Sequence, residues 1–170
     1  IFLEDICESH GVKAHNGMKR GSTGLGATFS FYYGHHMTTI EGGMICTDNE
    51  DLYELMKIKR SHGMARLLSP HLYKEAIENH PDIDPAFLFL TDGYNFRNTE
   101  LNAVIGLEQL KRLDENIKLR RDNFDYFVNN LDPRLFYIPY NDPGNSSYSF
   151  PFVCKKPEDR EKLKSIFDEL

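Results

Sequence analysis

Several features that define common protein classes are missing from this sequence of 170 residues. No apolar run approaches the roughly 20 residues of a membrane-spanning helix, so we expect no membrane-embedded part. The net charge of −6 argues against nucleic-acid binding, which a basic face usually marks. The first residues, IFLEDICE, lack the basic region and apolar core of a signal peptide, and none is expected there. With 40% hydrophobic and 27% charged residues, the composition is that of an ordinary soluble globular protein.

Motifs for metals and nucleotides are also missing. Cys7, Cys46 and Cys154 form no C-x-x-C pair, so we expect reduced thiols in a cytoplasmic protein and no structural zinc. The histidines show neither H-x-x-x-H nor H-E-x-x-H spacing, and no metal site is predicted. The glycine-rich loop 12–26 contains neither of the standard nucleotide-binding patterns.

The hydrophobic pattern predicts short strands early in the chain. Buried strands are expected at residues 1–3, 27–32 and 42–47. A helix is predicted over 48–62, with Asp48 as its cap and Gly63 as its stop, and a shorter helix around 72–77. The first strand lacks an initiator methionine and the last helical pattern lacks a stop, so we expect a fragment of a longer chain.

A long helical stripe dominates the second half. Apolar residues recur every three or four positions from Val104 through Leu131, after Asn98 or Thr99 as a cap. This length fits two helices in succession or one long helix that crosses between domains. A strand over 147–154 and a helix over 158–170 would then begin a small α+β unit.

Residues 27–44, ATFSFYYGHHMTTIEGGM, hold the groups with the most chemical potential. His35 suits acid–base chemistry, because an unperturbed imidazole titrates near pH 6.5. The Ser30 hydroxyl at a strand end could bind phosphate, or could simply be solvated. Asp5 follows the first strand, where ligands of open α/β sheets gather, although it could equally cap a helix.

Four ordered blocks carry a specific resemblance that spans essentially the whole chain. They are EDICESHG, GATFSFYYGHHMTTIEGGMICTDNEDL, KRSHGM and GYNFRNTELNAVIGLEQLKRLDENIKLRR. The sequence resembles the sugar aminotransferase (DegT/StrS-type) family of pyridoxal-phosphate (PLP) enzymes. The resemblance implies the α/β aspartate-aminotransferase fold (fold type I). Residues 1–115 would belong to the PLP-binding large domain, and residues 116–170 would begin a small α+β C-terminal domain.

The same resemblance implies roles for individual residues. Asp5 matches the aspartate that pairs with the pyridine nitrogen, Glu8 stands near the ring hydroxyl, and Ser30 matches the serine that binds the cofactor phosphate. Asn95 matches an asparagine that reaches the cofactor phosphate of the neighbouring subunit, which implies a homodimer with shared active sites. Arg97 would lie near the substrate or the interface, or form an ordinary salt bridge.

The departure from the family pattern is at position 35. Most members have a lysine there that forms the Schiff base, whereas this chain has His35. With a histidine at this position, the sequence resembles the sugar 3-dehydratases of the family, and most closely their GDP-linked group. These enzymes act in deoxysugar and lipopolysaccharide O-antigen biosynthesis. The implied substrate is a nucleotide-linked 4-keto-6-deoxyhexose, with pyridoxamine phosphate regenerated by an amino donor such as glutamate. His35 would take a proton from the cofactor and protonate the departing C3 hydroxyl.

Three alternatives remain open from the sequence. One is a nucleotide-sugar aminotransferase similar to perosamine synthases, in which another residue serves. A second is an iron–sulfur-assisted CDP-sugar 3-dehydrase, although the cysteines show no cluster motif. The third is a catalytically silent member used as a regulator or scaffold.

Overall fold

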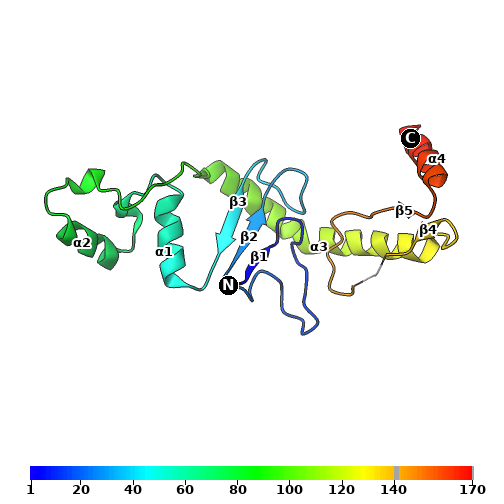
Figure 1. Cartoon of the computed structure of the whole chain (residues 1–170), viewed down its shortest axis with the longest axis horizontal. Helices are drawn as coiled ribbons and strands as arrows, with labels where there is room; N and C mark the ends of the chain where they lie inside the picture. The colour runs from blue at the N-terminus through cyan, green and yellow to red at the C-terminus, as the bar shows by residue number, and fades with distance from the viewer. Residues whose placement is uncertain (140–141, 170) are drawn as a thin grey trace.

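The structure is a computed structural model that describes residues 1–139 and 142–169. The molecule is elongated, with a small sheet near its middle (Figure 1). Helices α1 and α2 lie on one side of the sheet, and α3 runs from the sheet to the far end, where β4, β5 and α4 gather. The elements are β1 (Leu3–Asp5), β2 (Gly26–Ser30), β3 (Gly43–Cys46), α1 (Glu50–Lys59), α2 (Pro70–Asn79), α3 (Glu100–Asn130), β4 (Phe136–Tyr137), β5 (Val153–Cys154) and α4 (Pro157–Asp168), with short 3-10 turns at Ala65–Leu67 and Pro85–Phe87.

The central sheet has the order β1-β2-β3. β1 pairs with β2 in parallel, with Asp5 opposite Thr28. β2 pairs with β3 antiparallel, with Ser30 opposite Gly43. Side chains alternate between the two faces of a strand, so Asp5, Thr28 and Ser30 share one face and Phe29 takes the other. The strands predicted at 27–32 and 42–47 are confirmed, with bounds at Gly26–Ser30 and Gly43–Cys46.

The prediction of a buried strand at residues 1–3 is wrong. Ile1, Phe2 and Leu3 are exposed, and the strand is Leu3–Asp5 with Glu4 at its buried position. Glu4 is 6% exposed because the loop before β2 folds over its carboxylate. The amides of Gly21, Thr23 and Gly24 donate to it at 3.0, 2.8 and 2.9 Å, and the Thr23 hydroxyl donates at 3.0 Å. Hydrogen bonds from a distant loop thus place a charge where the apolar pattern predicts a hydrophobic residue.

Helix α1 follows β3 closely. Its cap is Asn49, whose side-chain oxygen accepts from the Leu52 amide at 2.8 Å, and not the predicted Asp48. Gly63 lies beyond the helix at φ +79°, and its amide donates to the Ile58 carbonyl at 2.9 Å. The helix predicted around 72–77 is confirmed as α2. With the two short turns it encloses a small core of Ala65, Ala76 and Leu88.

The long stripe forms one helix, α3, of 31 residues. Of the two predicted caps the structure selects Thr99, whose amide donates to the Asn102 side chain at 3.1 Å. The expected division at 115/116 falls inside α3 and remains a prediction. Among the described residues, no helix joins the length and the apolar character that crossing a bilayer requires.

The C-terminal part is built around aromatic rings. Phe150 contacts Phe124 and Phe127 of α3 with ring centroids 5.0 Å apart. Phe152 contacts the Phe167 ring of α4 at 5.8 Å. The strand predicted at 147–154 is confined to β5, and most of that segment is irregular. The last predicted helix is confirmed as α4, and its final predicted residue, Leu170, lies outside the described residues.

The Glu4 contacts predict an acid-sensitive stability. The backbone amides of Gly21 and Thr23 lead in lowering the pKa of Glu4 from 4.5 to about 2. The contribution of this carboxylate is therefore complete above pH 4.5 and is lost as the pH falls from 4.5 to about 2. We expect Glu4→Gln to lower the thermal midpoint at pH 7, and the gap from the parent protein to close between pH 4.5 and 2. Calorimetry of both proteins at pH 7, pH 4.5 and pH 2 measures this difference in thermal midpoint.

Glu75→Gln on the exposed side of α2 is the matched control, and it should leave the thermal midpoint unchanged. A gap between Glu4→Gln and the parent protein that is equally wide at pH 7 and pH 2 would contradict a charge-dependent contact.

Candidate active site

Asp5 ends β1 as a carboxylate on the sheet's open face. Its Oδ1 accepts from the Cys7 amide at 3.0 Å and from the Thr28 hydroxyl at 3.4 Å. Hydrogen bonding by Cys7 is the main cause that lowers the pKa of Asp5, with Thr28 and the nearby His35 adding to it. The carboxylate is therefore ionised near neutral pH and can pair with a cationic ring nitrogen.

Ser30 ends β2 on the same face. Its Oγ accepts the Tyr32 amide at 3.2 Å, so its hydrogen remains free to be donated to an anion. Thr28, two residues earlier, links the strand to Asp5. The sequence reasoning missed Thr28, although the alternation from Thr28 to Ser30 could have indicated it.

His35 lies in the turn that follows β2, and its amide donates to the Tyr32 carbonyl at 3.1 Å. Its Nε2 is 3.8 Å from the carboxylate of Glu8, with side-chain exposures of 13% and 61% respectively. Its Nδ1 is buried and has no hydrogen-bond partner within the described part of the chain. Glu8 thus faces the imidazole directly, a contact that the sequence reasoning did not predict.

Two further histidines, His36 and His10, are buried close to this turn. His36 and His10 are each 4% exposed, and their rings lie 5.8 Å apart. Burial is the main cause that lowers the pKa of His36, and it lowers the pKa of His10 to about 4. Both rings are therefore neutral at pH 7. The sequence reasoning did not single them out, because their role depends on burial.

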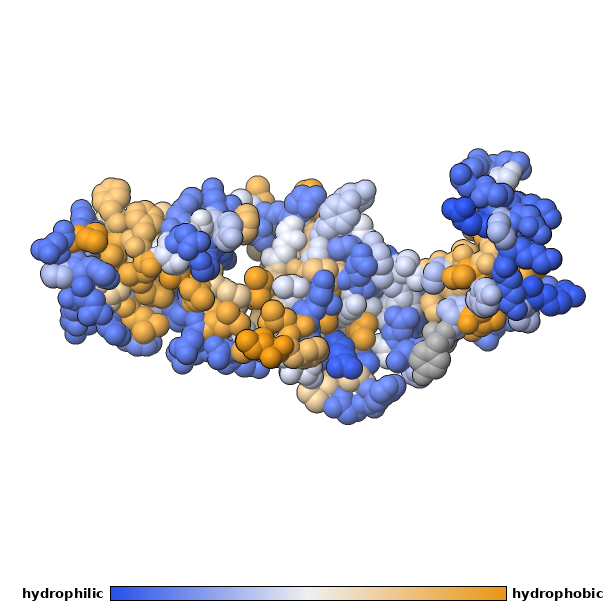
Figure 2. All heavy atoms as spheres, viewed as in Figure 1, coloured by the Kyte–Doolittle hydropathy of each residue, from blue (hydrophilic) through white to orange (hydrophobic). Residues whose placement is uncertain are grey.

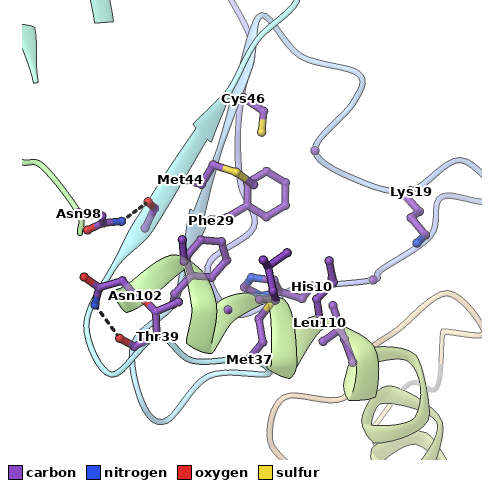
Figure 3. Close-up of a pocket in the computed structure, with 18 of the residues that line it drawn as sticks. His10, Lys19, Phe29, Met37, Thr39, Met44, Cys46, Asn98, Asn102 and Leu110 are labelled. Carbon is purple, nitrogen blue, oxygen red and sulfur yellow. Dashed lines mark hydrogen bonds between the residues drawn. The ribbon is translucent and has the colours of Figure 1, made fainter. Parts of the chain in front are cut away.

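The loop after the histidine pair is fixed by the first turn of α3 and by the segment just before that helix. Asn102 donates to the Thr39 carbonyl at 2.9 Å, and Asn98 donates to the Gly43 carbonyl at 3.4 Å (Figure 3). A cavity of about 760 Å³ lies between α3 and the face of the sheet that bears Phe29. Figure 3 shows residues that line it. This face is opposite to Asp5 and Ser30, so the cavity is not the predicted cofactor site.

Asn95 and Arg97 lie in the segment before α3. Asn95 accepts from the Arg97 Nε at 3.3 Å and pairs with Ser61 after α1. Arg97 lines a second cavity of about 660 Å³ together with Lys57, Arg60 and Thr28. Among the described residues neither side chain contacts Asp5, Ser30 or His35, so their predicted roles remain proposals.

The described residues offer no metal site. Within residues 1–139 and 142–169, no group of three or more His, Cys, Asp or Glu side chains is placed to hold a metal ion. The three cysteines are unbridged.

Figure 2 shows apolar residues exposed around the N-terminal end of β1, where Ile1, Phe2 and Leu3 lie.

Known proteins resemble this chain over nearly its whole length. The GDP-4-keto-6-deoxy-D-mannose 3-dehydratase of Escherichia coli O55:H7 (strain CB9615 / EPEC) is 38% identical over 157 residues, which cover 92% of this chain and 40% of that protein. The solved structure of the E. coli enzyme of this name with bound hydrated PLP superimposes with a TM-score of 0.86 at 35% identity, over 99% of this chain and 44% of that one. A structure of GDP-4-keto-6-deoxymannose-3-dehydratase with a trapped PLP-glutamate geminal diamine gives 0.82 at 33% identity, over 96% and 43%.

This chain therefore spans less than half of the length of the proteins it matches. The superpositions confirm the predicted fold class, the PLP-dependent aminotransferase fold. The model of the DegT/DnrJ/EryC1/StrS aminotransferase family matches residues 1–170, and the chain belongs to this family.

Proposed function

We propose that this chain is part of a PLP-dependent enzyme that removes the C3 hydroxyl from a nucleotide-linked 4-keto-6-deoxyhexose. The observation that carries the proposal is the imidazole of His35 at the place of the family's cofactor-binding lysine. In the described part of the chain, no lysine amine forms a hydrogen bond or ion pair with Asp5, Ser30 or His35. GDP is the first nucleotide to test, because the similar proteins are named for GDP-linked sugars.

The residues present fit the cofactor. The ionised carboxylate of Asp5 would pair with the pyridinium nitrogen, and the available hydroxyl of Ser30 would donate to the phosphate. The buried Nδ1 of His35 has no hydrogen-bond partner among the described residues, and the nearby His35 is one of the groups that lower the pKa of Asp5. Glu8 would lie beside the ring hydroxyl.

The proposed mechanism rests on one imidazole that accepts a proton and returns it. The cofactor, when bound in its amine form, would supply an amine that can condense with the sugar ketone and a ring that accepts electrons. His35 takes a proton through an unprotonated ring nitrogen, and the facing carboxylate of Glu8 stabilises the cationic ring that results. His35 then gives this proton to the departing hydroxyl. Asp5 keeps its negative charge throughout, because its pKa is lowered.

The remaining parts of the proposal concern partners. Glutamate would restore the amine form of the cofactor, in line with the PLP-glutamate adduct of a similar structure. Asn95 would reach the cofactor phosphate of a second copy, so that a homodimer shares its sites, and Arg97 would act near the substrate or the interface. Three unbridged cysteines suit the reducing cytoplasm. The product would enter deoxysugar and lipopolysaccharide O-antigen synthesis.

A second candidate is a nucleotide-sugar aminotransferase, which the name of the family favours. The two differ in whether the cofactor is held covalently. Borohydride treatment of the PLP-loaded protein, followed by mass spectrometry, should yield no phosphopyridoxyl-lysine. Incubation of the intact protein with glutamate, PLP and a GDP-linked 4-keto-6-deoxyhexose should release ammonia and a 3-deoxy sugar. An amino sugar as the product would instead establish the aminotransferase.

We expect His35→Asn to abolish dehydration and to keep cofactor binding. Loss of a general acid–base group lowers the rate by about 10²- to 10⁴-fold. Ammonia release measures turnover, and the absorbance of bound PLP measures occupancy. His80→Asn, at the exposed end of α2, is the control and should keep full activity. Turnover by His35→Asn at the parent rate would exclude His35 as the base.

We expect Asp5→Asn to lower turnover by about 10- to 100-fold, because a charge-assisted hydrogen bond contributes roughly 1.5–3 kcal/mol. The exposed Asp48→Asn makes the same change outside the site and should have no effect. Steady-state rates at pH 7 compare the three proteins. Equal rates for Asp5→Asn and Asp48→Asn would show that Asp5 carries no role in the reaction.

A further inference from the structure

The segment 144–148 ties the C-terminal part of the chain to the turn that bears His35. Its Ser146 carbonyl lies 3.1 Å from the Nε2 of His36. The Gly144 carbonyl accepts the Lys13 amide at 2.9 Å, and the Tyr148 carbonyl accepts the Arg120 Nη1 of α3 at 3.0 Å. Figure 1 shows this stretch, which follows the grey trace, against the middle of α3. Three separate regions therefore fix its path.

Its backbone is also closely packed. Ser146 is 1% exposed and Ser147 is 7% exposed. Ser147 has φ +52°, a left-handed conformation that is unfavourable for a side chain-bearing residue. The Asn145 side chain accepts the Ser147 amide at 2.9 Å and stabilises this turn. This conformation leads directly into Tyr148.

Tyr148 reaches both histidines of the pair. Its ring lies 5.4 Å from the His35 ring at 84°, an edge-to-face contact, and 5.8 Å from the His36 ring. Tyr32 makes a second edge-to-face contact with His35, at 5.4 Å and 73°. Tyr32 belongs to the same turn as His35, whereas Tyr148 comes from more than a hundred residues away.

The His35 ring needs such a support. Its Nδ1 has no hydrogen-bond partner in the described residues, and its Nε2 is 3.8 Å from Glu8, beyond hydrogen-bond distance. Among the described residues, the two tyrosine rings are the edge-to-face contacts that restrain the orientation of this ring. Of these, only Tyr148 is anchored to another part of the fold, through Ser146 and Arg120.

We propose that Tyr148 is a positioning residue, whose ring holds the His35 imidazole in its working orientation and shields it from water. The consequence for catalysis rests on the proposed function, whereas the contact itself does not. The ring, and not the phenolic hydroxyl, performs this role.

The experiment compares Tyr148→Leu, which removes the ring, with Tyr148→Phe, which keeps it. We expect Tyr148→Leu to lower kcat about 10- to 100-fold with little change in KM, because a small misplacement of a catalytic group has an effect of this size. Tyr148→Phe should restore the parent kcat. The exposed Tyr126→Leu on α3 is the matched control and should behave as the parent protein.

A second readout does not require turnover. Diethyl pyrocarbonate modifies unprotonated imidazole, and tandem mass spectrometry separates His35 from His36. In the cofactor-free protein, His35 should react several-fold faster in Tyr148→Leu and at the parent rate in Tyr148→Phe and Tyr126→Leu. Arg120→Met, which removes the hydrogen bond to the Tyr148 carbonyl, should also speed the reaction, and it replaces Tyr148→Leu if that variant does not fold.

The outcomes separate the two proposals. A parent-like labelling rate in Tyr148→Leu would overturn the positioning role, and so would an equal loss of kcat in Tyr148→Phe and Tyr148→Leu. Faster labelling in a protein that dehydrates no sugar would support the positioning of His35 and refute the proposed function alone.

Discussion

The parallel pairing of β1 with β2 is the constraint on which the site depends. Its register sets Asp5 opposite Thr28, so that Thr28 and Ser30 share a face with that carboxylate. A slip of one residue would move Asp5 to the opposite face. Glu4 helps to prevent this slip, because its carboxylate accepts four hydrogen bonds from the loop that leads into β2. A buried charge thus stabilises the alignment of the cofactor-binding face.

The base is placed by a different set of contacts. His35 lies beyond the end of β2 in a turn, where the sheet no longer fixes the side chain. Asn102 of α3 holds the following loop through the Thr39 carbonyl, and Tyr148 packs against the His35 ring. Asp5 and Ser30 therefore depend on strand register, whereas His35 depends on packing between distant parts of the chain.

This division explains what could be predicted from the sequence. Local periodicity was sufficient for β2, β3 and α2, it located α3 without deciding between one helix and two, and the family blocks pointed to Asp5, Ser30 and His35. Periodicity failed at residues 1–3, because hydrogen bonds from residues 21–24 place Glu4 inside. It could not choose between Asp48 and Asn49, since either side chain can cap a helix. Tyr148 left no local signal, because its role arises only from the path of segment 144–148.

Whether a histidine can act at the lysine position also depends on the charges of the residues around it. A second positive charge near His35 would oppose a proton on its ring. Burial lowers the pKa of His10 and of His36, so neither ring carries a positive charge at pH 7. The carboxylate of Glu8 lies 3.8 Å from the His35 ring, and Asp5 interacts with that ring electrostatically. The histidine that replaces lysine therefore has a carboxylate facing its ring and no competing imidazolium from His10 or His36.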